Sequence, residues 1–167
     1  AKVKNYTGTL GAAIHIFDLL FWILNKKPIF VTAFGNNIAT SKSNFKKDSF
    51  LIYILEFQNK LIAKVTANLA CVYKHFHEFK IFDKKMTLVH SLSSTYKLSL
   101  KKNKYQKIET TYPDHKNKKK LIREFIEVIN KNKKNIMSHK NQFDLMSLCF
   151  AADKSHKLRK KVKIKYI

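Results

Sequence analysis

Only three glycines, Gly8, Gly11 and Gly35, occur among the 167 residues of this chain. Loops that wrap the phosphates of a nucleotide need several glycines at fixed spacing, because the backbone must approach the phosphates closely. Neither G-x-G-x-x-G nor G-x-x-x-x-G-K-[ST] can be written with these three positions. The chain therefore has no glycine-rich nucleotide loop, and a nucleotide cofactor would have to be held by another domain.

The length and the apolar content predict a single folded domain over residues 1–167, with a hydrophobic core of ordinary size. Hydrophobic residues make up 45% of the chain, which excludes a disordered basic tail. The two cysteines, Cys71 and Cys149, form no C-x-x-C pair, which indicates a reducing compartment, and we expect a cytoplasmic protein. The longest apolar stretch, residues 14–24, contains Asp18 and is too short to span a bilayer, so we expect no membrane insertion.

The formal net charge of +23 suggests an anionic partner. However, only two of the 34 basic residues, Arg123 and Arg159, are arginines. Arginine is the residue favoured for bidentate contacts to phosphate and guanine. The lysines are spread over every segment, and Lys, Asn, Ile, Phe and Tyr share A/T-rich codons. The charge is thus better explained by an A/T-rich genome than by nucleic-acid binding, which we keep as an alternative function.

Hydrophobic periodicity predicts one helix, about six strands, two further helices and a closing strand. The predicted helices span residues 9–25, 121–129 and 141–156, and residues 101–120 are predicted to form a loop. The predicted strands span residues 29–34, 50–57, 61–71, 76–82, 86–90, 96–100 and 162–166. We expect residues 50–57 to be covered on both faces and the first helix to be buried. This order predicts an α+β fold, an open-faced and mostly antiparallel sheet with helices packed on one face.

Residues 8–22 read GTLGAAIHIFDLLFW. This segment resembles the motif that opens the C-terminal domain of the glucose–fructose oxidoreductase / inositol dehydrogenase (Gfo/Idh/MocA) family, roughly D-x-x-x-H-x-x-D-L-L-x-W after a glycine-rich entry. Further segments are similar to a sugar-oxidising branch of that family and occur in the same order along nearly the whole chain: residues 28–37, 64–68, 75–77, 143–152 and 162–166.

The resemblance implies a two-domain enzyme. In this family an N-terminal Rossmann domain binds NAD or NADP and supplies a catalytic lysine, and the C-terminal domain closes the substrate site and assembles oligomers through its free sheet face. The chain is then expected to be the second domain, inactive alone, with a Rossmann domain, a sugar-type substrate and further copies of itself as partners. The expected reaction is oxidation of a secondary alcohol of a sugar or cyclitol. A structural oligomerisation domain without catalysis remains an alternative.

His15 is the predicted catalytic residue. By resemblance it lies beside the substrate hydroxyl that loses its proton, and imidazole suits this task because it titrates near neutrality. The alternative is a histidine inside a buried helix. The aspartate that the family carries four residues earlier is replaced here by Gly11, so its carboxylate is missing from the shared helix face. Asp18 is expected to make polar or packing contacts and not to replace it.

Four further residues are predicted to bind substrate. His75 and His77 are expected on one face of a strand, where they contact substrate by resemblance or are ordinary surface histidines. Two imidazoles are too few for zinc, so no metal site is expected. Asn36 is a candidate for hydrogen bonding to a sugar, with turn formation as the alternative. Lys64 is expected to face either the cleft or a neighbouring subunit.

Overall fold

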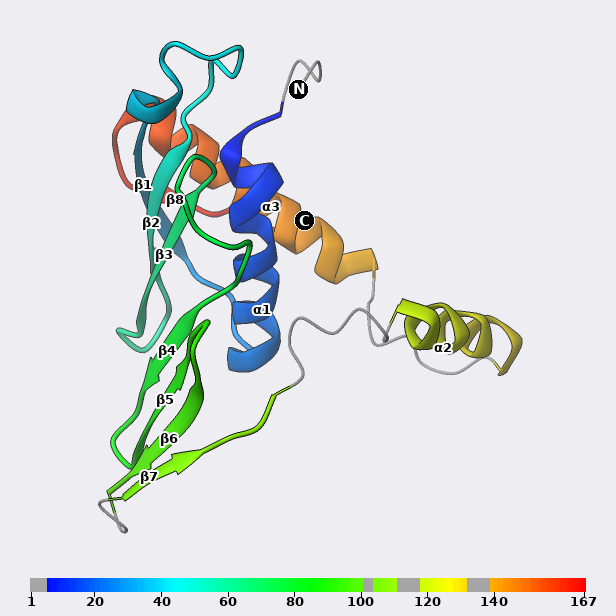
Figure 1. Ribbon diagram of the computed structural model, residues 1–167. Coiled ribbons are helices and arrows are strands. Elements are labelled where there is room, and N and C mark those ends of the chain that lie inside the picture. The colour runs from blue at the N-terminus through cyan, green and yellow to red at the C-terminus, as the bar shows by residue number, and fades with distance from the viewer. Residues whose placement is uncertain (1–5, 101–103, 111–117, 132–138) are drawn as a thin grey trace. The chain divides into compact units, whose positions relative to one another are not determined.

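A computed structural model describes residues 6–100, 104–110, 118–131 and 139–167 (Figure 1). The chain divides into two compact units, which are described separately. The first unit comprises residues 1–72 and 136–167, and the second comprises residues 73–135. The α+β class is confirmed.

The first unit is a four-stranded antiparallel sheet with two long helices on one face (Figure 1). The strand order is β3-β2-β1-β8, and both α1 and α3 pack on the same side. In chain order the elements are the π-helix η1 (Thr9–Ala13), α1 (Ile14–Leu24), β1 (Phe30–Asn36), the 3-10 helix η2 (Ile38–Thr40), β2 (Phe50–Glu56), β3 (Ile62–Asn68), α3 (His139–Leu158) and β8 (Val162–Lys163).

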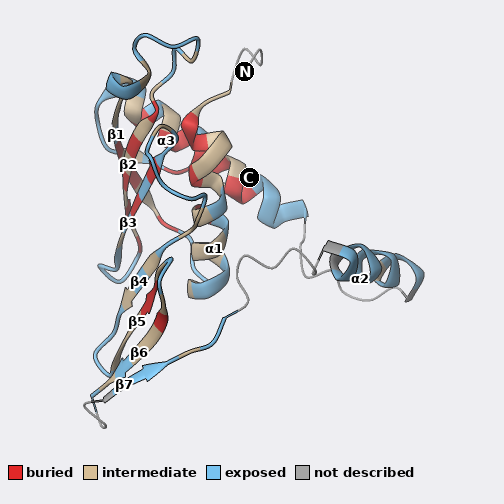
Figure 2. Ribbon diagram, in the orientation of Figure 1, coloured by how far each residue is buried: buried red, intermediate tan, exposed pale blue. Residues whose placement is uncertain are grey.

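The core of the first unit lies between this sheet and its helices (Figure 2). Every second residue of β1, β2 and β3 points to the helices, as the alternating pattern requires. Phe17 of α1 and Tyr53 of β2 are fully buried and meet edge to face, with ring centroids 5.1 Å apart. The other buried apolar side chains include Val31, Ala33, Leu51, Leu55, Val65, Leu145, Leu148 and Ala152.

The second unit contains an antiparallel meander in the order β4-β5-β6-β7. Its strands are β4 (Phe79–Phe82), β5 (Met86–His90), β6 (Thr95–Ser99) and β7 (Lys104–Lys107), and the unit also contains α2 (Lys118–Lys131). The predicted turn at residues 83–85 is confirmed, because the Asp83 amide donates to the Met86 carbonyl over 2.9 Å.

Several predictions of detail are wrong. The strands form two sheets and not one, because an irregular segment at residues 69–78 separates β3 from β4. Part of the predicted loop at residues 101–120 is β7, which pairs with β6; residues 101–103 and 111–117 lie outside the described residues.

The predicted burial of two elements and the predicted length of a third are also wrong. The second face of β2 is only half-buried. Phe17 is the buried residue of α1, and the helix is otherwise half-buried or exposed. The closing strand β8 has two residues instead of five.

His90 is a buried histidine of the second unit. Its side chain is 7% exposed and lies against the rings of Phe76 and Phe79, each with its centroid 5.0 Å away. Its Nδ1 lies 2.6 Å from the hydroxyl of Thr95. Removal from water disfavours the imidazolium and lowers the pKa of His90. The unfolded chain, where histidine titrates at about pH 6.5, therefore takes up the proton first.

We expect the meander to be fully stable above about pH 6.5 and to lose stability as the pH falls towards the lowered pKa of His90. Hydrogen exchange of the β5 amides between about pH 7.5 and pH 5.5, corrected for the intrinsic pH dependence of exchange, measures this loss. The variant His90→Gln should abolish the loss, whereas His75→Gln, at an exposed position, should retain it. An unchanged pH dependence in His90→Gln would rule out His90 as its source.

Candidate functional site

The start of the first helix is fixed to both layers of the first unit by a polar cluster. The hydroxyl of Thr7 donates to the Asp153 carboxylate of α3 over 3.0 Å, and Thr9 bonds to the other oxygen of that carboxylate. The Tyr53 hydroxyl lies 2.9 Å from the Thr9 hydroxyl. Burial raises the pKa of Tyr53 well above its usual range, so it remains a neutral phenol. The cluster therefore holds the entry to the helix in one position.

A five-residue π-helical turn, η1, leads into α1 and ends two residues before His15. Single π-turns inside helices are uncommon and occur frequently at functional sites. Gly11 lies in this turn, and its amide donates to the Thr7 carbonyl over 2.9 Å. A Cβ atom placed on Gly11 would lie 1.9 Å from the Tyr6 hydroxyl, so the Tyr6 side chain occupies the space beside residue 11. The predicted helix at residues 9–25 thus exists, but it begins as a π-helix.

His15 lies on the exposed side of α1. Asp18 and Trp22, three and seven residues further on, are exposed as well, and Trp22 retains 77% of its accessible surface. The spacing places the three side chains along one stripe, opposite to the core contact of Phe17. The alternative of a histidine inside a buried helix is therefore wrong. An imidazole, a carboxylate and an indole together offer a proton acceptor, a hydrogen-bond acceptor and an apolar surface.

Asn36 and Lys64 lie on the other face of the sheet. Asn36 ends β1, and its side-chain oxygen accepts the amide proton of Ile38 over 3.1 Å, which is turn formation. Lys64 lies on β3, whose exposed positions alternate with the buried Val65 and Ala67. Because α1 and α3 cover the buried side, the structure does not bring Lys64 together with His15.

His75 and His77 precede β4 and do not lie on a strand, so the predicted strand at residues 76–82 is shorter than expected. Their rings nevertheless meet edge to face, with centroids 5.2 Å apart. Both belong to the second unit, whereas His15 belongs to the first. Within the described residues, no group of three or more His, Cys, Asp or Glu side chains could hold a metal ion.

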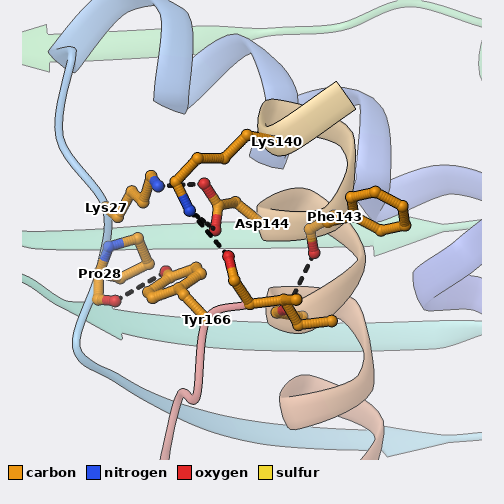
Figure 3. Close-up of polar contacts among 8 residues, drawn as sticks. Lys27, Pro28, Lys140, Phe143, Asp144 and Tyr166 are labelled. Carbon is orange, nitrogen blue, oxygen red and sulfur yellow. Dashed lines mark hydrogen bonds and ion pairs between the residues drawn. The ribbon is translucent and has the colours of Figure 1, made fainter. Parts of the chain in front are cut away.

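A second polar cluster, which sequence reasoning missed, closes the opposite end of the first unit (Figure 3). The fully buried Asp144 of α3 bonds to the ammonium of Lys27, and the ammonium of Lys140 lies 3.7 Å from its other oxygen. Lys27 also lies over the ring of Tyr166, 5.2 Å from the centroid, and Tyr166 donates to the Pro28 carbonyl over 2.8 Å. These contacts fix the link between α1 and β1, and their role is structural.

Comparison with known proteins relates this chain to an oxidoreductase family. Residues 2–164 match the family model described as "Oxidoreductase family, C-terminal alpha/beta domain". The fold is similar to that of levoglucosan dehydrogenase in complex with NADH and levoglucosan (TM-score 0.77, 13% identity), with 93% of this chain and 50% of that chain covered.

Two further solved structures give the same result. They are myo-inositol 2-dehydrogenase from Lactobacillus plantarum (TM-score 0.67, 12% identity, 98% and 50% covered) and UDP-N-acetylglucosamine 3-dehydrogenase from Acidithiobacillus ferrooxidans (TM-score 0.76, 11% identity, 93% and 49% covered). The chain thus spans about half the length of the structures it resembles. No curated protein matches the chain. Among the described residues, no helix is long and apolar enough to cross a membrane.

Proposed function

The chain belongs to the oxidoreductase family with this C-terminal alpha/beta domain, the Gfo/Idh/MocA family, and from this membership we propose that it closes the substrate site of an NAD- or NADP-dependent dehydrogenase. The proposed substrate is a secondary alcohol of a sugar or cyclitol. The observation that carries the proposal is the exposed stripe of His15, Asp18 and Trp22 on α1, which follows a π-turn anchored to the core. We propose that this stripe faces the substrate and a Rossmann domain.

The proposed task of His15 is to take the proton of the reacting hydroxyl while the carbon beneath it loses a hydride. The nicotinamide cofactor supplies the acceptor for that hydride. The three glycines form no glycine-rich phosphate loop of the kind that holds a cofactor pyrophosphate, so we assign the cofactor to the other domain. His15 suits proton transfer because it is exposed on a helix and because imidazole exchanges protons near neutral pH.

The three similar dehydrogenases support the substrate class. Their names specify levoglucosan, myo-inositol and UDP-N-acetylglucosamine, and each of these molecules carries secondary hydroxyls on a ring. The shared chemistry is therefore that of a ring alcohol.

A substrate screen tests this proposal. The protein carrying this chain and its Rossmann domain is incubated with NAD or NADP and a panel of sugars, cyclitols and nucleotide sugars, and formation of reduced cofactor is followed by absorbance. We expect reduction with at least one ring alcohol, no reduction with ethanol, and no tight NAD binding by residues 1–167 alone in calorimetry. Absence of reduction with every member of the panel, or tight NAD binding by this chain alone, would contradict the proposal.

We also propose that the open face of the first sheet joins copies of the protein. Phe34 and Ile62 are 52% and 64% exposed on this face, and half-buried apolar side chains surround them: Phe30, Phe50, Ile52 and Ile54. Exposing an apolar sheet face of this kind to water is unfavourable in free energy. Lys64 lies on the same face and is then expected to lie at the subunit contact.

The double variant Phe34→Lys and Ile62→Lys is expected to dissociate the oligomer, because it places two charges on the proposed contact face. Sedimentation velocity measures the change as a loss of the larger species. Leu158→Lys, which changes a 45% exposed leucine at the end of α3, is the matched control and should leave assembly unchanged. An oligomer that survives the double variant would place the contact elsewhere.

A further inference from the structure

Tyr6 occupies the space beside Gly11. A Cβ atom on Gly11 would lie 1.9 Å from the Tyr6 hydroxyl oxygen, 2.2 Å from Cζ and 2.9 Å from Cε1. Real Cβ atoms do not approach other atoms so closely, so the tip of the ring lies directly over the backbone of residue 11. Any other residue at position 11 would push the Tyr6 ring away. Gly11 and Tyr6 are therefore a coupled pair.

The position of the Tyr6 hydroxyl matters because of where Gly11 lies relative to His15. Residue 11 precedes His15 by four positions, and side chains with this spacing share one face of a helix. The Tyr6 hydroxyl thus occupies the space that a side chain at position 11 would fill, and a side chain there would neighbour the imidazole of His15. The backbone next to Tyr6 is fixed, since Thr7 donates to Asp153 over 3.0 Å and accepts from the Gly11 amide over 2.9 Å.

We propose that Tyr6 is the positioning residue of His15, an inference that rests on the proposed function. A neutral imidazole has one N–H and one nitrogen with a lone pair. When the phenol oxygen of Tyr6 accepts the N–H, the tautomer is fixed and the lone pair of the other nitrogen is directed to the substrate hydroxyl. A phenol does this without a net charge, whereas a carboxylate would stabilise the imidazolium. Tyr6 acts through His15 and does not itself take the substrate proton.

Nuclear magnetic resonance of the imidazole nitrogens tests the proposed hydrogen bond between Tyr6 and His15 without any need for activity. The complete protein is labelled with nitrogen-15 histidine, and the His15 signals are assigned with the variant His15→Gln. We expect Tyr6→Phe to move the His15 tautomer ratio towards that of free histidine. Gly11→Ala, which displaces the ring and keeps the hydroxyl, should do the same. Tyr105→Phe, which changes an exposed tyrosine of the second unit, should not.

Kinetics test the consequence. Tyr6→Phe is expected to lower kcat about tenfold with KM little changed, because the tautomer and not the binding of substrate is altered. An unchanged His15 tautomer ratio in both Tyr6→Phe and Gly11→Ala would overturn the inference. Absence of any sugar oxidation by the unaltered enzyme would instead contradict the proposed function, and the tautomer measurement would still decide the role of Tyr6.

Discussion

Replacing His15 by alanine is expected to lower the kcat of the complete enzyme by about 10²- to 10⁴-fold. The reason is that the variant removes the proposed acceptor for the substrate proton while the cofactor and the substrate contacts of the other domain remain. Because His15 is exposed on α1, the fold should be unaffected. Steady-state kinetics measure the loss, and thermal unfolding of the same sample verifies that the fold is intact.

Asp18→Ala is the matched control for His15→Ala. Asp18 is exposed on the same stripe of α1, one turn further along, but no proton transfer is assigned to it. We expect its kcat to fall by less than about tenfold. A His15→Ala enzyme with full turnover would remove His15 from catalysis.

Phe17→Ala is expected to lower the free energy of unfolding by about 3–5 kcal/mol. Phe17 is the fully buried residue of α1, and its ring packs edge to face on Tyr53, at an interplanar angle of 80°. The variant opens a cavity at the junction of helix and sheet, where the surrounding backbone is held by the Thr9–Tyr53 contact and cannot collapse freely. Urea denaturation followed by circular dichroism measures the loss.

Trp22→Ala provides the comparison on the same helix. The indole of Trp22 is 77% exposed, so its removal should change the free energy of unfolding by no more than about 0.5 kcal/mol. If Trp22→Ala destabilised this chain as much as Phe17→Ala does, the orientation of α1 described above would be wrong.

Local periodicity predicted most elements of the fold, because it reports which face of a segment is buried. Residues 86–90 form β5 as predicted, and Asn25, predicted to end the first helix, adopts the left-handed conformation of a helix C-cap. The family resemblance identified His15 as a candidate catalytic residue. Periodicity alone could not do so, because it shows nothing of what surrounds a side chain. The prediction of a single sheet is wrong, because the hydrophobic pattern of a strand does not show which other strand it pairs with.

The contacts that build the site could not be predicted, because they join residues far apart in sequence. Lys27 and Asp144 are separated by 117 positions, and Thr9 and Asp153 by 144. The exposure of α1 was missed for a different reason. Its sequence is apolar on most sides, which is typical of a buried helix, yet this chain covers only the side of Phe17. Gly11 contained one usable signal, since a glycine within a helix often marks the close approach of another group.

We propose that this chain completes the site of a dehydrogenase for secondary alcohols, and isotope transfer tests this role most directly. A ring alcohol found active in the substrate screen is prepared with deuterium on the reacting carbon and incubated with the complete enzyme and oxidised cofactor. Mass spectrometry of the reduced nicotinamide should show one deuterium per turnover, with the matching ketone as product. A reduced cofactor without deuterium, or a product oxidised at another carbon, would contradict the account.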